Sequence, residues 1–105
     1  MRTGGFILLI AAVLVAPAAG AQDVSAGKEI AQTWCASCHN VDAKEKPTAR
    51  DAAPSFLSIA QMKSTTEMSL AAFLASPHGG MPNLTLSRKE IRDVSAYILS
   101  LHTQP

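Results

Sequence analysis

The segment Cys35-Ala36-Ser37-Cys38-His39 contains both cysteines of this 105-residue chain, and a histidine directly follows the second. Cysteines three positions apart project to neighbouring positions on a helical turn. Their thiols can therefore add across the two vinyl groups of one haem, and the adjoining imidazole can then reach the iron. The order C-x-x-C-H is the attachment signature of c-type haem. The segment predicts one covalent haem c, attached through Cys35 and Cys38, with His39 as an axial ligand of its iron.

Three other interpretations of these residues stay open at this point. A structural disulfide is possible, although a two-residue spacer closes a small, strained loop that stabilises little. Trp34 gives the pattern W-C-x-x-C of thioredoxin-like redox sites, but that fold needs βαβ units, and the chain shows no strands. A zinc site would need four ligands, and the cysteines with His39, His78 and His102 lack the paired spacing of zinc fingers.

A second axial ligand is expected, because His/Met ligation is common in haem electron-transfer proteins and raises the potential. Met81 is the favoured residue. It lies in Gly79-Gly80-Met81-Pro82, where glycines let the backbone approach a flat ligand and proline fixes the chain beyond. The other candidates are Met62 and Met68, which we expect in the core, His102, which we expect in solvent, and His78.

Four short helices and no strand are predicted after residue 22, which indicates an all-α fold wrapped around one haem. Helix starts are indicated by Asp23 or Ser25, by Pro54, by Thr65 or Thr66, and by the capping box Ser87-Arg88-Lys89-Glu90. We expect the first helix to reach Cys35 and Gly79-Gly80 to follow the third, with residues 40–53 as an irregular loop. The positions expected to face the core are Ile30 and Trp34; Phe56, Ile59 and Met62; Leu70, Phe73 and Leu74; and Ile91, Val94, Ile98 and Leu101.

Residues 1–21 have the pattern of a secretory signal peptide. Arg2 precedes eleven consecutive apolar residues, 6–16, and Ala19-Gly20-Ala21 provides the small-x-small cleavage pattern. We therefore expect cleavage after Ala21, an exported domain spanning 22–105, and a periplasmic location. An uncleaved segment would instead act as a membrane anchor, although eleven helical residues reach only about half of a ~30 Å hydrocarbon core.

The remaining 84 residues make a single small domain with a sparse core. The whole chain is 48% hydrophobic, but beyond residue 21 only 21 apolar side chains are larger than alanine or cysteine. Domains of this size commonly need a staple or a bound group. The net charge of +1 offers no basic stripe and so argues against nucleic acid as a partner.

From Gly27 to Leu101, these residues closely resemble class I c-type cytochromes, the small soluble monohaem electron carriers. Gly27 lies where that family has a glycine at the crossing of its first and last helices, and Tyr97 matches the aromatic residue packed there. Pro54 resembles the family proline whose carbonyl accepts a hydrogen bond from the proximal histidine, and Met81-Pro82 matches the distal-ligand loop. One departure is Ala31, where the family often has an aromatic residue that Trp34 would have to replace from another face.

The resemblance implies a periplasmic one-electron carrier with His39 and Met81 on the iron, and no enzyme. One alternative is the haem c subunit of a periplasmic dehydrogenase or oxidase complex, which a permanent apolar patch at Met81, Pro82 and Leu84 would favour. Another is a haem-based sensor or peroxidase-type enzyme, which needs a displaceable distal ligand. The expected partners are redox proteins such as a dehydrogenase, an oxidase or a respiratory complex. The protein itself is expected to be a monomer or a subunit of such a complex. A local positive rim is a further possibility, and it would consist of Lys44, Lys46, Arg50 and Lys63.

Overall fold

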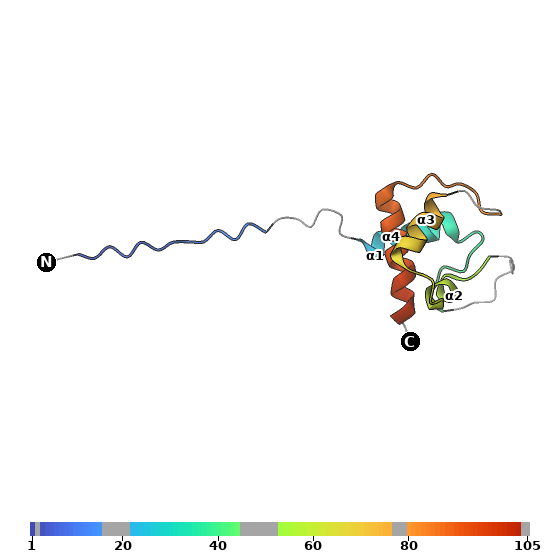
Figure 1. Cartoon of the computed structure of the whole chain (residues 1–105), viewed down its shortest axis with the longest axis horizontal. Helices are drawn as coiled ribbons and strands as arrows, with labels where there is room; N and C mark the ends of the chain where they lie inside the picture. Colours follow the sequence, from blue (N-terminus) through green and yellow to red (C-terminus); the bar gives the residue numbers. More distant parts are fainter. Residues whose placement is uncertain (2, 16–21, 45–52, 77–79, 104–105) are drawn as a thin grey trace.

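The computed structural model of the chain describes residues 1, 3–15, 22–44, 53–76 and 80–103. Within these ranges the regular structure is helical, apart from an isolated bridge position at Met81, which confirms the all-α prediction. Figure 1 shows α4 at the centre, with the other helices packed around it. The elements are α1 (Val24–Ile30), a π-helical turn (Ala31–Cys35), α2 (Phe56–Gln61), α3 (Glu67–Ala75), α4 (Arg88–Ser100) and a 3₁₀ turn (Leu101–Thr103).

Each α-helix begins at a side chain that caps its free backbone N–H groups. Asp23, and not Ser25, caps α1 by accepting from the Ala26 N–H at 3.0 Å, and Ser55 caps α2. The box expected at Ser87 and Glu90 is present, since each side chain bonds the other residue's backbone N–H. Thr66 forms a second reciprocal box at α3. Such caps satisfy donors that have no partner inside the helix.

The crossing of α1 and α4 requires glycine at position 27. A Cβ atom on Gly27 would lie 1.9 Å from the backbone oxygen of Asp93 and 3.0 Å from Tyr97 Cβ. The two backbones therefore touch without an intervening side chain. Ala31, one turn further along, is fully buried. Trp34 does not supply an aromatic ring at this crossing, because its side chain is 57% exposed.

A buried carboxylate connects the start of α1 to α4. Asp93 is only 2% exposed, and its Oδ1 accepts the backbone N–H of Asp23 at 3.0 Å. Its Oδ2 pairs with Lys89 Nζ at 2.5 Å. The hydrogen bond from Lys89, followed by that from the Asp23 backbone, lowers the pKa of this carboxyl against the opposing effect of burial. Asp93 thus holds the first residues of the helical domain against the last helix.

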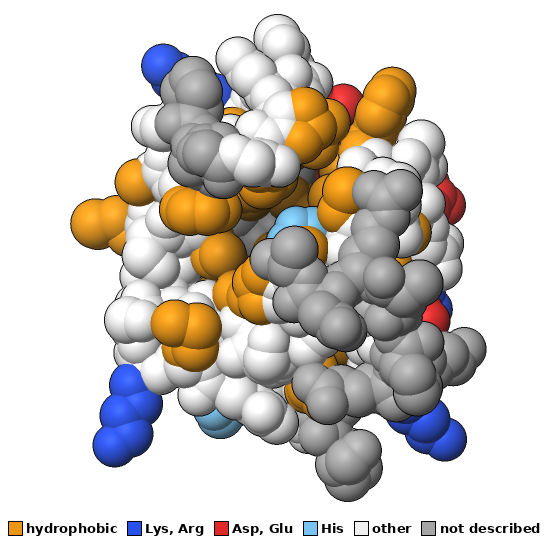
Figure 2. Space-filling model, turned by 90° about the vertical axis from the view of Figure 1, so that its right-hand side faces the viewer, with side chains coloured by type: hydrophobic (Ala, Val, Ile, Leu, Met, Phe, Trp, Pro, Cys, Tyr) orange, Lys and Arg blue, Asp and Glu red, His pale blue; other side chains and the backbone are white. Residues whose placement is uncertain are grey.

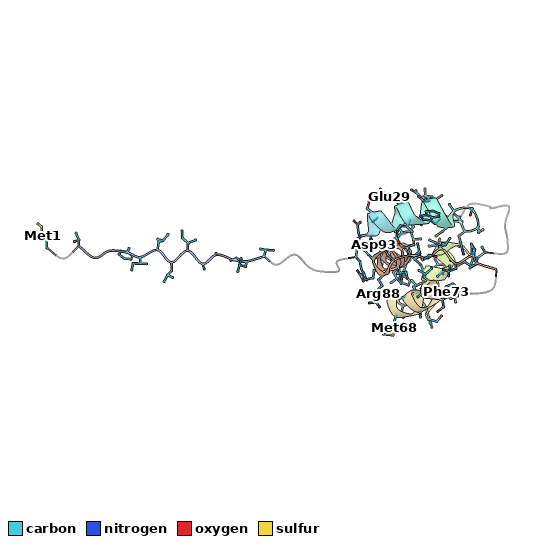
Figure 3. All side chains as sticks on the ribbon, turned by 90° about the horizontal axis from the view of Figure 1, so that it is seen from above. Met1, Glu29, Met68, Phe73, Arg88 and Asp93 are labelled. Carbon is cyan, nitrogen blue, oxygen red and sulfur yellow. The ribbon has the colours of Figure 1, made fainter. Side chains whose placement is uncertain are left out.

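The core is narrow and centred on α4. The stripe predicted at Ile91, Val94, Ile98 and Leu101 is buried, as are Phe56 and Leu70 from α2 and α3. Figure 3 looks along α4 and shows the helix bearing Glu29 on one side of it and the helix bearing Met68 and Phe73 on the other. Many of the remaining core positions are small side chains, including Ala31, Ala60 and Ala96.

Besides Trp34, which was also expected to face the core, three apolar residues expected in the core are exposed instead. Phe73 on α3 is 54% exposed, Met68 is 82% exposed, and Met62, which follows the last residue of α2, is 55% exposed. For Met68 and Phe73 the reason is that the apolar residues of α3 are not confined to one side of the helix, so that the side bearing Leu70 is buried and other apolar side chains stay exposed. Pro77 and the pair Gly79-Gly80 were expected to end α3, and the helix ends at Ala75, where Ser76 leaves the helical conformation with φ −114° and ψ 139°; Pro77 and Gly79 lie outside the described residues.

The N-terminal segment stands apart from the helices. Residues 3–15 are exposed and have no regular secondary structure, and Figure 1 shows them leading away from the domain. Among the described residues, no helix combines the length and the apolar character needed to cross a bilayer. The predicted cleavage position after Ala21 and most of the loop preceding Pro54 lie outside the described residues.

Candidate haem-binding site

Both cysteines and the histidine lie on one compact turn at the end of α1. The first helix does not run to Cys35 as a regular α-helix, because it widens into a π-helical turn in which the Ala36 N–H bonds to Ala31 O at 3.0 Å. The N–H groups of Cys38 and His39 then both bond to Cys35 O, at 3.2 and 2.9 Å. A π-helical turn is uncommon and often marks a functional site. Here it sets the direction from which the C-x-x-C-H segment leaves α1.

The two cysteines are thiols that no disulfide links, so the disulfide interpretation is wrong for this structure. Cys35 is buried and Cys38 is partly buried. Burial raises the pKa of the Cys35 thiol, which keeps it in its neutral form near pH 7. Two thiols on one turn are the groups that thioether formation with a porphyrin would consume.

The imidazole of His39 is held by a backbone carbonyl from a distant part of the chain. Its Nδ1 lies 2.6 Å from Pro54 O, and because a carbonyl only accepts, Nδ1 carries the proton and donates it. Nε2 therefore keeps a lone pair for a metal, the arrangement usual for histidine ligands. The ring of Phe56 packs against the imidazole, with ring centroids 5.4 Å apart. A backbone bond from the Phe56 N–H to Asn40 O at 2.9 Å fixes the two segments against each other.

Met81 lies in a separate, non-helical segment between α3 and α4. Gly80, directly before it, has a φ of +81°, a left-handed conformation that glycine adopts without strain. The Met81 side chain is partly buried, unlike those of Met62 and Met68. His102 is exposed, as expected, and His78 lies outside the described residues.

Two residues support the site in ways that sequence reasoning missed. Tyr97 was expected at the helix crossing, but its Oη also donates to Val41 O at 2.5 Å, which ties the chain just after His39 to α4. Phe56 lies between the rings of His39 and Tyr97, with its centroid 6.5 Å from that of Tyr97. The only sequence signal for either role was an aromatic residue beside an expected core position.

This donor set fits a covalently attached haem better than the other interpretations. The described residues contain no group of three or more His, Cys, Asp or Glu side chains that could hold a metal ion, which leaves the zinc interpretation without support. The thioredoxin interpretation fails because those same ranges contain no sheet. Figure 2 shows a face on which hydrophobic side chains gather around a histidine, as a flat apolar ligand with a metal at its centre requires.

A small helical domain with two thiols on one turn, an imidazole held at Nδ1 and a methionine in a separate loop defines a class of protein that binds a metalloporphyrin covalently. Comparison with known sequences places this chain within that class. The sequence model of the cytochrome c family matches residues 24–102. A relative, cytochrome c-552 of Bradyrhizobium diazoefficiens, is 41% identical over 97 residues, which cover 92% of each chain. No solved structure gave a significant match.

The chain belongs to the cytochrome c family. It therefore carries covalent haem c with its iron, and it functions as a haem c electron carrier.

Proposed function

We propose that this electron carrier works in the periplasm, with Cys35 and Cys38 as the thioether residues and His39 and Met81 as the two axial ligands. The observation that carries the ligand assignment is the 2.6 Å contact between His39 Nδ1 and Pro54 O. That contact fixes the tautomer and the direction of Nε2, and it is formed by the residue next to the cysteine pair.

The residues of this chain contribute binding, orientation and the exclusion of water. Pro54, whose carbonyl accepts the hydrogen bond from His39 Nδ1, fixes the tautomer of the ring and restrains its rotation. The Met81 thioether, a soft and neutral donor, favours the reduced metal and raises the potential. When bound, haem supplies the one-electron couple between Fe(II) and Fe(III). With both axial positions filled by protein side chains, no position is left for a small substrate, so we assign electron transfer and no catalysis.

The domain division belongs to the same proposal. Residues 1–21 direct export and are removed after Ala21, and residues 22–105 form the working haem domain. The support for this is the N-terminal sequence pattern and the position of the Asp23 cap, where α1 begins directly after the expected cleavage site. The partners would be periplasmic redox proteins, such as a dehydrogenase or an oxidase, met by transient contacts.

The ligand assignment is tested by methionine substitution in the exported, haem-loaded protein. We expect Met81→Ala to abolish the absorption signature of methionine–iron ligation and to let the reduced protein bind carbon monoxide. It should also lower the midpoint potential, because the soft, neutral thioether that favours the reduced iron is lost. Met62→Ala and Met68→Ala are matched controls, since both side chains are exposed, and they should change neither the spectrum nor the potential.

Intact mass spectrometry of the exported protein tests the covalent attachment and the processing together. We expect residues 22–105 plus one haem. Because each thiol adds across a vinyl group without a leaving group, Cys35→Ala or Cys38→Ala should keep the mass of one haem and leave one vinyl group unreacted, which the absorption band of the reduced pyridine complex reports. A mass without haem would overturn the attachment residues. A mass that retains residues 1–21 would leave the haem assignment intact and replace the export proposal with a membrane anchor.

A further inference from the structure

The segments that carry the candidate haem contacts contain no charged residue. Residues 30–41 include Cys35, Cys38 and His39, residues 53–62 include Pro54, and residues 80–87 include Met81; none of these ranges contains Asp, Glu, Lys or Arg. The 17 charged residues of the chain all lie outside these three ranges, which we call the neutral collar.

The fold brings two ranges of the neutral collar together. Pro54 O accepts a hydrogen bond from His39, and the ring of Phe56 packs against the same imidazole. Among the side chains that the structure describes, Figure 2 shows hydrophobic ones in the middle of one face, around a histidine, and Lys, Arg, Asp and Glu at its margin. Of the described groups, a partner that approaches this face therefore meets apolar and uncharged polar ones first.

Trp34 is the largest exposed side chain of the neutral collar. It directly precedes Cys35, and although its neighbours Ala31 and Cys35 are buried, 57% of Trp34 is exposed. The π-helical turn is responsible, because the extra residue per turn redirects the side chains on either side of it. The helix crossing does not use this ring, so its exposure next to a haem-attachment cysteine has no structural explanation within the domain.

We propose that Trp34 anchors the docking of a redox partner whose own contact face is apolar and uncharged. The inference rests on the proposed attachment of haem through Cys35. A charged partner face would find no opposite charge in the neutral collar, and burying a charge without a partner is costly. An exposed indole buries a large area with few rotatable bonds, and tryptophan is among the residues that most often dominate protein interfaces.

The charge-based alternative makes a different prediction. If Lys44, Lys46, Arg50 and Lys63 formed a docking rim, the partner face would be acidic and association would weaken steeply with salt. Docking through Trp34 and the neutral collar would instead depend little on ionic strength. Docking through a charged rim and docking through Trp34 can therefore be distinguished by whether the protein binds more strongly to a charged or to an apolar surface.

Gold electrodes coated with methyl-, carboxylate- or ammonium-terminated thiol monolayers serve as the probe surfaces for the haem-loaded protein. Bound mass from a quartz crystal microbalance and the interfacial electron-transfer rate from voltammetry are measured at low and high salt. We expect the highest coverage and rate on the methyl surface, with less than about a twofold change between salts. Trp34→Ser should lower coverage there by about tenfold, the loss typical of an interface anchor, and Trp34→Phe should restore most of it.

Met68→Ser is the matched control, because Met68 is an apolar side chain that is 82% exposed on α3, outside the neutral collar (Figure 3). It should change coverage by less than about twofold. Preference for the carboxylate surface with a steep loss in salt would overturn the proposal, and so would equal effects of Trp34→Ser and Met68→Ser. A dimer in sedimentation that Trp34→Ser dissolves would identify a second copy of the chain as the occupant and also overturn it. Haem content is measured first in every variant, so that a failure of haem attachment is distinguished from a failure of docking.

Discussion

At the scale of single residues, the helix crossing depends on the missing side chain of Gly27. A methyl group there would overlap the Asp93 backbone, which cannot move without displacing α4. We expect Gly27→Ala to lower the free energy of unfolding by about 3 kcal/mol, at the upper end for overpacking. Lys28→Ala, at the exposed next position, should change it by less than about 0.5 kcal/mol. Urea denaturation of the haem-loaded variants measures both, and similar midpoints would contradict the close packing of α1 on α4.

Tyr97 makes a second single-residue contribution through one hydrogen bond. Its hydroxyl donates to Val41 O, and burial, followed by the charge of Asp42, raises its pKa. Tyr97→Phe keeps the ring and leaves the carbonyl unsatisfied, so it should cost about 1–3 kcal/mol of unfolding free energy. Tyr97→Leu removes the ring as well and should cost more. A phenylalanine variant as stable as the parent would show that water replaces the hydroxyl.

At the scale of elements, the attachment between α1 and α4 is sensitive to acid. The pKa of Asp93 is lowered by Lys89 and the Asp23 backbone, so the folded state binds fewer protons than an unfolded chain near the usual aspartate pKa of about 3.9. The contribution of Asp93 to the unfolding free energy is therefore complete above about pH 4 and is lost as the pH falls through the lowered folded pKa.

We therefore expect Asp93→Asn to be less stable than the parent at pH 7, by about 1–3 kcal/mol, and to approach it near pH 2. Urea midpoints measured across this range, at constant ionic strength, test the convergence. Glu29→Gln removes one negative charge from an exposed position on α1 and controls for net charge. A constant gap between parent and Asp93→Asn at all pH values would show that the carboxylate charge itself contributes nothing.

The elements also show how far sequence reasoning reached. Local signals were sufficient for the helices, because Ser87 and Glu90 form their box from residues three apart, and the stripe on α4 has one clear apolar side. Two hydrogen bonds could not be predicted from the sequence, because no local pattern encodes them. The bond from Asp23 to Asp93 joins residues 70 positions apart, and that from Tyr97 to Val41 joins residues 56 apart. In α3 the pattern misled, since apolar residues distributed all around a helix give no indication of which side faces inward.

The candidate site could likewise be predicted only in part. The roles of Cys35, Cys38 and His39 follow from their spacing in the sequence alone. The approach of Pro54 to His39 came from the resemblance, and the structure supplies the contact at 2.6 Å. The exposure of Trp34 could not be deduced, because it depends on a π-helical turn that the sequence Ala31–Cys35 does not announce.

At the scale of the whole molecule, the sparse core links folding to the cofactor. The core relies on alanine at several positions, and apolar side chains such as Phe73 remain exposed around the haem-bearing face. A domain of this size buries too little apolar surface to be more than marginally stable by itself. We therefore expect the double variant Cys35→Ala, Cys38→Ala to lose most of its helical signal in far-ultraviolet circular dichroism at 37 °C and to be digested rapidly by protease.

The haem-loaded parent should resist both treatments under the same conditions, because a group bound only by the folded state stabilises it. A variant that retains one cysteine distinguishes the effect of losing a covalent bond from the effect of losing the apolar contacts with haem. If attachment through a single thioether suffices, Cys35→Ala with haem bound should stay folded while melting at a lower temperature than the parent. A cysteine-free chain that keeps full helicity and protease resistance would contradict this dependence and show that the side chains around α4 suffice to fold the domain.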